Sequence, residues 1–110
     1  MSYRIEISSI AESEADRAFL QLSQISSPAK ASQWYSGLFD AIASLSEMPN
    51  RCSLARENNN FSQEIRQLIY GRGRNSYRVI FTILEAQDMT TVRILHIRHG
   101  SQQTIGEDPE

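Results

Sequence analysis

The spacing of hydrophobic side chains changes once along this chain, and that change limits the folds it can adopt. Between residues 10 and 48, apolar side chains recur every three or four positions, which is the period of an α-helix. From residue 64 onward they fall into β-prone runs separated by short polar turns. Residues 3–7 alternate apolar and polar side chains, as a half-buried strand does. The order of elements is therefore predicted to be β-α-α-β-β-β.

The helical half is expected to form an antiparallel hairpin. Ser9 and Glu12 have the spacing of a capping box, so we expect a helix over about residues 10–24. Ser27 followed by Pro28 indicates the start of a second helix, because serine caps free amides and proline at the first position gives up no hydrogen bond. The apolar positions of the two stripes are Ala15, Phe19, Leu22, Ile25, Ala31, Tyr35, Leu38, Ile42 and Leu45. Two helices joined by about three residues pack side by side in opposite directions.

The second half is expected to form an antiparallel meander after a loop over residues 49–63. The three expected strands cover residues 64–70, 77–84 and 91–98. Short turns join them, and Gly71 and Gly73 in the first turn are free to take positive φ. Because both layers carry apolar faces, the helical hairpin must cover one face of the sheet. The fold class is therefore predicted to be α+β.

The length of 110 residues is typical of one domain. We expect residues 1–100 to form this domain and residues 101–110 to be a flexible, polar and acidic tail. No apolar run reaches the ~20 residues needed to cross a bilayer, and the charges in residues 3–6 interrupt the apolar stretch that a signal peptide needs. We therefore expect a cytoplasmic protein with no membrane partner. Because Cys52 is the only cysteine, an internal disulfide is excluded.

Positive charge is concentrated in the strand-rich half. The formal net charge of −2 argues against a strongly basic nucleic-acid binder. Residues 61–100, however, hold six arginines against three acidic residues, and arginine accounts for ten of the eleven basic residues. A guanidinium group has a fixed charge and a planar shape that suits phosphate. The distribution therefore indicates a local anionic target.

Four of these arginines lie within the expected strands, namely Arg66, Arg78, Arg93 and Arg98. Arg66, Arg78 and Arg98 fall in three consecutive strands, where a buried cation is costly without a partner. We expect them to converge on a shared anionic site. The alternative is that they form internal ion pairs with Glu6, Glu64 or Glu85.

The two histidines suggest acid–base chemistry rather than metal binding. His96 and His99 are three positions apart, so on a strand their side chains point to opposite faces and cannot share a metal ion. We expect no metal and no cofactor. His99 follows the last expected strand, where an imidazole would suit proton transfer, whereas His96 is expected to be packed within the sheet.

The strand-rich half resembles RelE/ParE-type toxins of bacterial type II toxin–antitoxin systems, also called plasmid stabilisation systems. The segment Tyr77-Arg78-Val79-Ile80-Phe81 is similar to the family's "YR-aliphatic-aliphatic-aromatic" strand, which follows a basic hairpin. Residues 92–100 are similar to the family's last strand. The resemblance spans about residues 3–100 and includes the N-terminal strand and the helical hairpin.

The resemblance implies two activities. RelE-like members cleave mRNA on the ribosome, whereas ParE-like members block DNA gyrase without a nuclease site, and an antitoxin protein neutralises both. Our first hypothesis is a metal-independent, ribosome-dependent endoribonuclease, or mRNA interferase. The alternatives are a ParE-like gyrase inhibitor and a degenerate member that only binds its antitoxin.

The nuclease hypothesis assigns roles by position in the family pattern. The implied catalytic residues are Arg78, Arg98 and His99, and the implied substrate-binding residues are Arg66, Arg72 and Arg74. Two arginines would hold the scissile phosphate while His99 transfers a proton. The chain departs from the nuclease pattern because no lysine pair precedes the "YR" strand and no tyrosine follows His99.

Overall fold

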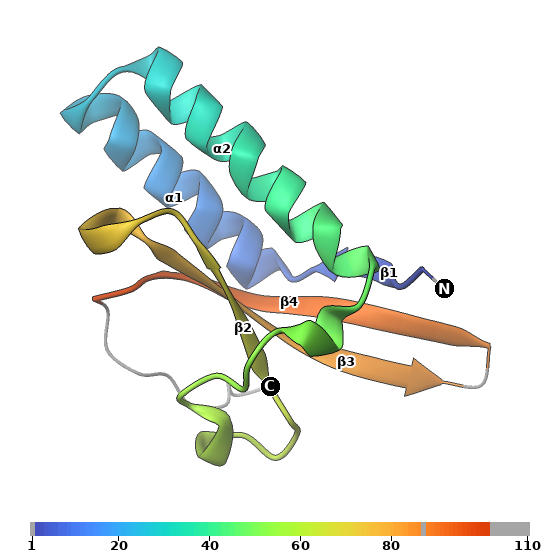
Figure 1. The fold of residues 1–110 in the computed structure, drawn as a ribbon. Helices are drawn as coiled ribbons and strands as arrows, with labels where there is room; N and C mark the ends of the chain where they lie inside the picture. Colours follow the sequence, from blue (N-terminus) through green and yellow to red (C-terminus); the bar gives the residue numbers. More distant parts are fainter. Residues whose placement is uncertain (1, 87, 102–110) are drawn as a thin grey trace.

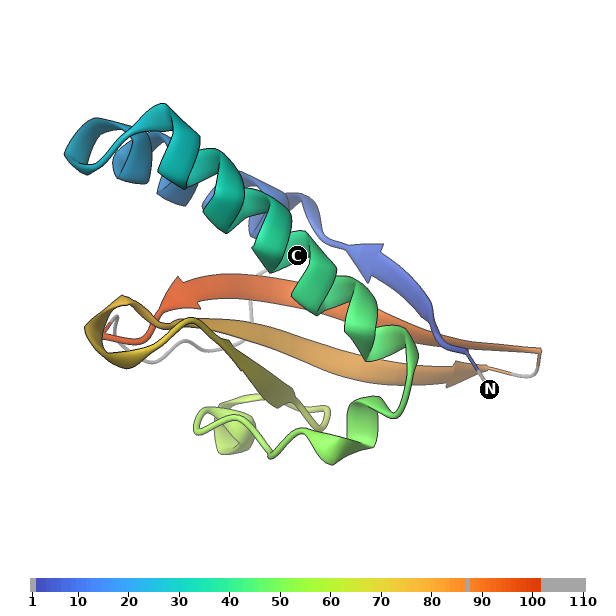
Figure 2. The same ribbon diagram turned by 45° about the horizontal axis from the view of Figure 1, so that its top comes forward.

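The computed structural model describes residues 2–86 and 88–101, which form two helices packed on a four-stranded sheet (Figures 1 and 2). The elements are β1 (Arg4–Ile7), α1 (Ser9–Ile25), α2 (Pro28–Ala43), β2 (Arg66–Tyr70), β3 (Tyr77–Ala86) and β4 (Met89–His99). The predicted α+β class and β-α-α-β-β-β order are confirmed. The predicted tail, apart from Ser101, lies outside the described residues.

The sheet has the strand order β1-β4-β3-β2. The last three strands form the expected antiparallel meander, and β1 pairs in parallel with β4, with Ile5 opposite Val92. The helical hairpin carries the chain across the sheet, from the edge strand β1 to β2 at the other edge. The β3–β4 turn is shorter than predicted, since the strands extend to Ala86 and begin again at Met89. In the β2–β3 turn, Gly71 and Gly73 take left-handed φ values of 98° and 60°.

The helix starts follow local capping chemistry. The cap of α1 is Ser8 rather than the predicted Ser9, because the Ser8 hydroxyl accepts the amide hydrogen of Ala11 at 3.0 Å. The α2 cap is Ser27, as predicted, and its hydroxyl accepts the amide hydrogen of Lys30 at 3.1 Å. Within the part of the chain that the structure describes, no helix is long and apolar enough to span a bilayer.

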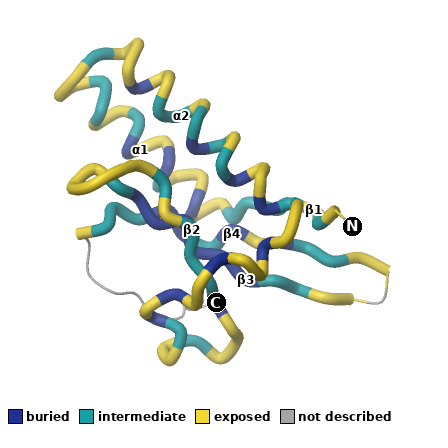
Figure 3. The backbone as a smooth tube through the Cα atoms, in the orientation of Figure 1, coloured by how far each residue is buried: buried dark blue, intermediate teal, exposed yellow. Residues whose placement is uncertain are grey.

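The main core lies between the helices and the sheet, and Figure 3 marks the buried positions along the backbone of both layers. Its centre contains Leu38 and Ile42 from α2, Phe81 from β3 and Ile94 from β4, all essentially inaccessible to solvent. A smaller cluster of Ala55, Ile65 and Ile80 lies on the other face of the sheet. Figure 2 shows residues 49–63 on that face, opposite the helices. The segment that the sequence predicted as a loop therefore covers a second face.

Candidate functional site

Arg78 lies buried under the loop that covers the second face of the sheet. Its guanidinium donates to the two carboxylate oxygens of Glu57, with Nη1–Oε1 at 2.8 Å and Nη2–Oε2 at 2.5 Å, and to Oε1 of Gln67 at 2.9 Å. Arg78 is 4% exposed and Glu57 is 1% exposed. The hydrogen bonds from Arg78 lower the pKa of Glu57, although burial alone would raise it. Both groups are thus held as an ion pair that solvent does not reach.

Arg66 lies on the opposite face of the sheet from Arg78. Its cross-strand partner is Phe81 of the main core, and cross-strand partners have side chains on the same face of a sheet. Phe81 and Arg78 are three positions apart on β3, so their side chains point to opposite faces. The Arg66 guanidinium donates to the carbonyl oxygen of Cys52 at 2.6 Å and to Glu64 at 3.1 Å. The ion pair with Glu64 is the alternative that the sequence had left open.

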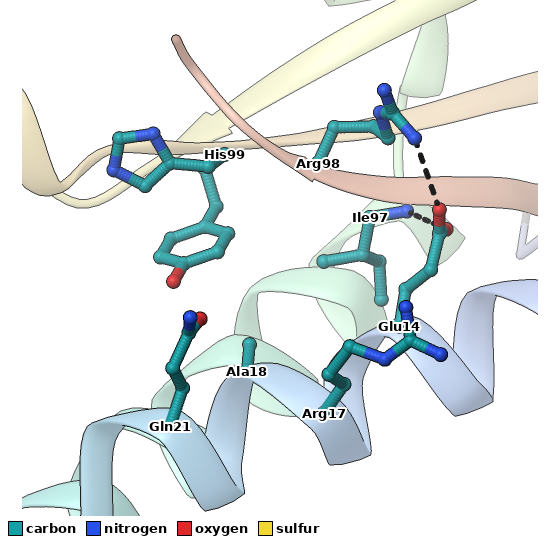
Figure 4. Close-up of a pocket in the computed structure, with 8 residues that line it drawn as sticks. Glu14, Arg17, Ala18, Gln21, Ile97, Arg98 and His99 are labelled. Carbon is teal, nitrogen blue, oxygen red and sulfur yellow. Dashed lines mark hydrogen bonds and ion pairs between the residues drawn. The ribbon is translucent and has the colours of Figure 1, made fainter. Parts of the chain in front are cut away.

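Arg98 is the cross-strand partner of Arg78, but it pairs with another carboxylate. Its Nη1 lies 3.6 Å from Oε2 of Glu14, which comes from α1 (Figure 4). The predicted convergence of Arg66, Arg78 and Arg98 on one anionic site is therefore wrong, because each pairs with a different carboxylate. The catalytic and substrate-binding roles assigned to them stay predictions.

Glu14 holds the edge of β4 beyond the end of β1. The ladder between these strands ends at Ile94, and further along the Glu14 carboxylate accepts the amide hydrogen of Ile97 at 2.8 Å. The same carboxylate lies 3.2 Å from Nδ1 of His96, which is buried as predicted. Figure 4 shows Glu14 extending from α1 to β4. Its carboxylate accepts a backbone hydrogen bond that a neighbouring strand would otherwise accept.

Replacing Glu14 by alanine is expected to lower the free energy of unfolding by about 1–3 kcal/mol, because the Ile97 amide loses its acceptor. Urea denaturation followed by circular dichroism measures the change. The matched control is Glu12→Ala, which removes an exposed carboxylate from the first turn of α1 and should cost at most about 1 kcal/mol. Equal losses for the two variants would contradict the role given to Glu14.

His99 stands where three hollows meet at one end of the molecule. The first hollow, about 360 Å³, lies between α1 and the end of β4 and is lined by Arg17 and Gln21 (Figure 4). The second, about 540 Å³, lies under the helices and is lined by Lys30 and Trp34, and the third, about 530 Å³, lies beside the β2–β3 turn. This end of the molecule is the candidate functional site.

The His99 ring is half-buried and is positioned by its neighbours. It makes an edge-to-face contact with the Tyr77 ring at 5.2 Å between centroids, and its Nδ1 lies 2.7 Å from the Ser101 hydroxyl. Burial raises the pKa of Tyr77. Arg72 and Arg74 are exposed in the adjacent β2–β3 turn, and Arg74 lines the third hollow. The structure thus places His99, Arg98 and Arg74 in the linings of these hollows. Arg78 is the cross-strand partner of Arg98, but neither it nor Arg66 lines these hollows.

Sequence reasoning missed four side chains that shape this arrangement. Arg17 and Lys30 line the hollows, and Glu14 and Glu57 hold the arginines. A signal existed for Glu14, Arg17 and Gln21, because helix positions three and four apart lie on one face. No such signal existed for Glu57, which lies in a segment without periodicity.

The comparisons with known proteins agree on the kind of fold. The chain matches the family described as "ParE toxin of type II toxin-antitoxin system, parDE" over residues 5–104. A solved structure described as "Chromosomal ParDE TA system from P. aeruginosa" superposes with a TM-score of 0.71 at 15% sequence identity, covering 89% of this chain and 96% of that one. At this identity, the structural likeness is evidence for the fold alone. The sequence has no match among curated proteins.

Proposed function

The chain belongs to the ParE toxin family of type II toxin–antitoxin systems, and we propose that it acts by binding and inhibiting DNA gyrase rather than by cleaving RNA. Membership of the family makes it a toxin component with an antitoxin as partner. The observation that carries the choice between the two activities is the burial of Arg78 against Glu57.

RNA cleavage by the residues assigned from the sequence requires two arginines on one phosphate. Both terminal nitrogens of the Arg78 guanidinium are already engaged by Glu57, and the loop excludes solvent from the pair. Freeing Arg78 would leave an unpaired buried carboxylate, which costs several kcal/mol. A toxin that works by occupying its target needs no such rearrangement. The geometry therefore supports the gyrase alternative better than the nuclease hypothesis.

A supercoiling assay with purified gyrase and relaxed plasmid tests this proposal. The toxin is expected to reduce supercoiling as its concentration approaches that of the enzyme, and added cognate antitoxin should restore supercoiling. Relaxation by a type I topoisomerase, which is not a target, serves as the control. Primer extension on cellular mRNA after induction should show no new cuts at codon positions. Such cuts together with unaffected gyrase would overturn the proposal in favour of the nuclease.

A further inference from the structure

The basic side chains of this protein divide into two groups according to their partners. Five arginines lie within ion-pair distance of carboxylates, namely Arg56, Arg66, Arg78, Arg93 and Arg98. Arg51 donates to backbone carbonyls, and Arg4 contacts the Met89 sulfur. The remaining four basic residues are Arg17, Lys30, Arg72 and Arg74, all exposed and none in an ion pair with a residue that the structure describes.

These four residues, which we call the basic end, lie around the hollows that meet at His99. Arg17, Lys30 and Arg74 each line one of the hollows, and Arg72 is two positions before Arg74. Figure 1 shows the α1–α2 connection, the β2–β3 turn and the end of β4 together at this end of the molecule. The described linings of the hollows contain one acidic side chain, Glu14, which lies beside Arg98. Four basic side chains that form no ion pair within the described part of the chain thus lie at one end of a protein whose net charge is −2.

We propose that the basic end contacts the phosphodiester backbone of duplex DNA. This inference rests on the proposed function, since gyrase holds duplex DNA and a toxin bound to gyrase would lie near that DNA. Cations that pair with no carboxylate among residues 2–86 and 88–101 are suited to phosphate, because no ion pair within that part of the chain has to be broken on binding. The toxin would then recognise the enzyme together with its DNA.

The aromatic residues at this end favour a duplex over single-stranded nucleic acid. Proteins that bind single strands offer aromatic faces on which unpaired bases stack. Here Tyr77 is buried, and Trp34 packs against Tyr77 and Tyr70 at centroid distances of 4.9 and 6.2 Å. These rings pack on one another, and none of them is fully exposed. The available contacts are therefore cations for the backbone, which duplex DNA presents at high density.

Binding to DNA alone should be weak and strongly dependent on salt. Four phosphate contacts would give a slope of roughly −3 to −4 for the logarithm of the binding constant against that of the salt concentration. Non-specific contacts of this kind have Kd values on the order of 10⁻⁴ to 10⁻⁶ M at physiological salt. Binding to gyrase would hold the basic end close to DNA and so raise its effective concentration.

Fluorescence anisotropy with the full-length toxin and a labelled mixed-sequence duplex tests the inference, between about 50 and 200 mM salt. The variant Arg72→Gln/Arg74→Gln should bind more weakly, with a slope shallower by about 2. The variant Arg4→Gln/Arg93→Gln removes the same charge away from the basic end and should bind like the wild type. Equal weakening of both variants, no binding by the wild type at the lowest salt, or tighter binding to single-stranded RNA of the same length would each overturn the inference.

The supercoiling assay, run in parallel, separates this inference from the proposed function. Salt-dependent duplex binding that only Arg72→Gln/Arg74→Gln weakens, without any effect on gyrase, would reject the gyrase proposal and keep the DNA contact. Inhibition of gyrase by a toxin that does not bind the duplex would keep the gyrase proposal and reject the DNA contact. If both hold, Arg72→Gln/Arg74→Gln should need a higher concentration than the wild type for the same inhibition. Thermal unfolding of each variant verifies that it folds.

Discussion

Replacing Arg78 by methionine is expected to lower the free energy of unfolding by about 3–5 kcal/mol, because it leaves Glu57 buried without its partner. Glu57 is 1% exposed, and its carboxylate accepts hydrogen bonds from both terminal nitrogens of Arg78. A domain of this size has a total stability of about 5–15 kcal/mol, so the single variant should be partly unfolded at modest urea concentrations. Urea denaturation at neutral pH, with fluorescence and circular dichroism as two probes, measures the loss.

The matched control for this prediction replaces both partners. The double variant Arg78→Met/Glu57→Leu should be within about 1 kcal/mol of the wild type, because a buried ion pair exchanged for apolar side chains of similar size is often neutral or stabilising. Gln67, which also accepts from Arg78, is only half-buried and can turn toward water. If the double variant lost as much as the two single variants combined, the pair would not be coupled in the way the geometry implies.

The regular elements of this fold follow from local patterns that act over a few residues. The change from helical spacing to β-prone runs located both helices and the last three strands, and the Ser27-Pro28 signal placed the start of α2 correctly. The start of α1 was missed by one position, because two adjacent serines can both cap and only the backbone decides which one does. Such errors are small, since each depends on neighbouring residues alone.

The partners of the arginines depend on contacts between distant segments, and these were not predictable. Glu57 is 21 positions from Arg78 in a stretch without periodicity, and Glu14 reaches Arg98 from another layer of the fold. In the structure, Arg78 and Arg98 are cross-strand partners and lie on the same face of the sheet. The alternation of side chains along a strand predicts which face of the sheet a side chain occupies. It does not predict which carboxylate of a distant segment lies against that face. The arginines that are concentrated in the sequence of residues 61–100 therefore do not form one site, because Arg66, Arg78 and Arg98 pair with different carboxylates.

The same pairing shows which charges remain available for a partner. A strand arginine must be neutralised when it is buried, since desolvation is costly, whereas a turn or helix residue can stay in water. Accordingly Arg66, Arg78 and Arg98 pair with carboxylates, and the four residues of the basic end are in α1, α2 or the β2–β3 turn. The position of an arginine within its element is thus a better guide to surface function than the number of arginines in a segment.

The double variant Arg78→Met/Glu57→Leu also provides the strongest functional test, because we expect it to arrest growth on induction as the wild type does. If Arg78 serves the fold, a variant that restores stability restores the toxin, and gyrase inhibition should be unchanged. If Arg78 instead held RNA, removing its charge would abolish cleavage whatever the stability of the variant. Growth after induction from a tightly repressed promoter, with soluble protein quantified in the same cultures, measures the outcome.

The single variant Arg78→Met makes this comparison decisive. It should lose toxicity together with soluble protein, because unfolded chains are removed in the cell, and adding Glu57→Leu should recover both. A double variant that is soluble and as stable as the wild type but not toxic would contradict the gyrase proposal. It would support the catalytic role that the nuclease hypothesis gives to Arg78. Recovery of toxicity by a second substitution 21 positions away follows from the ion pair alone, since the leucine side chain introduced there cannot replace a guanidinium in any reaction with phosphate.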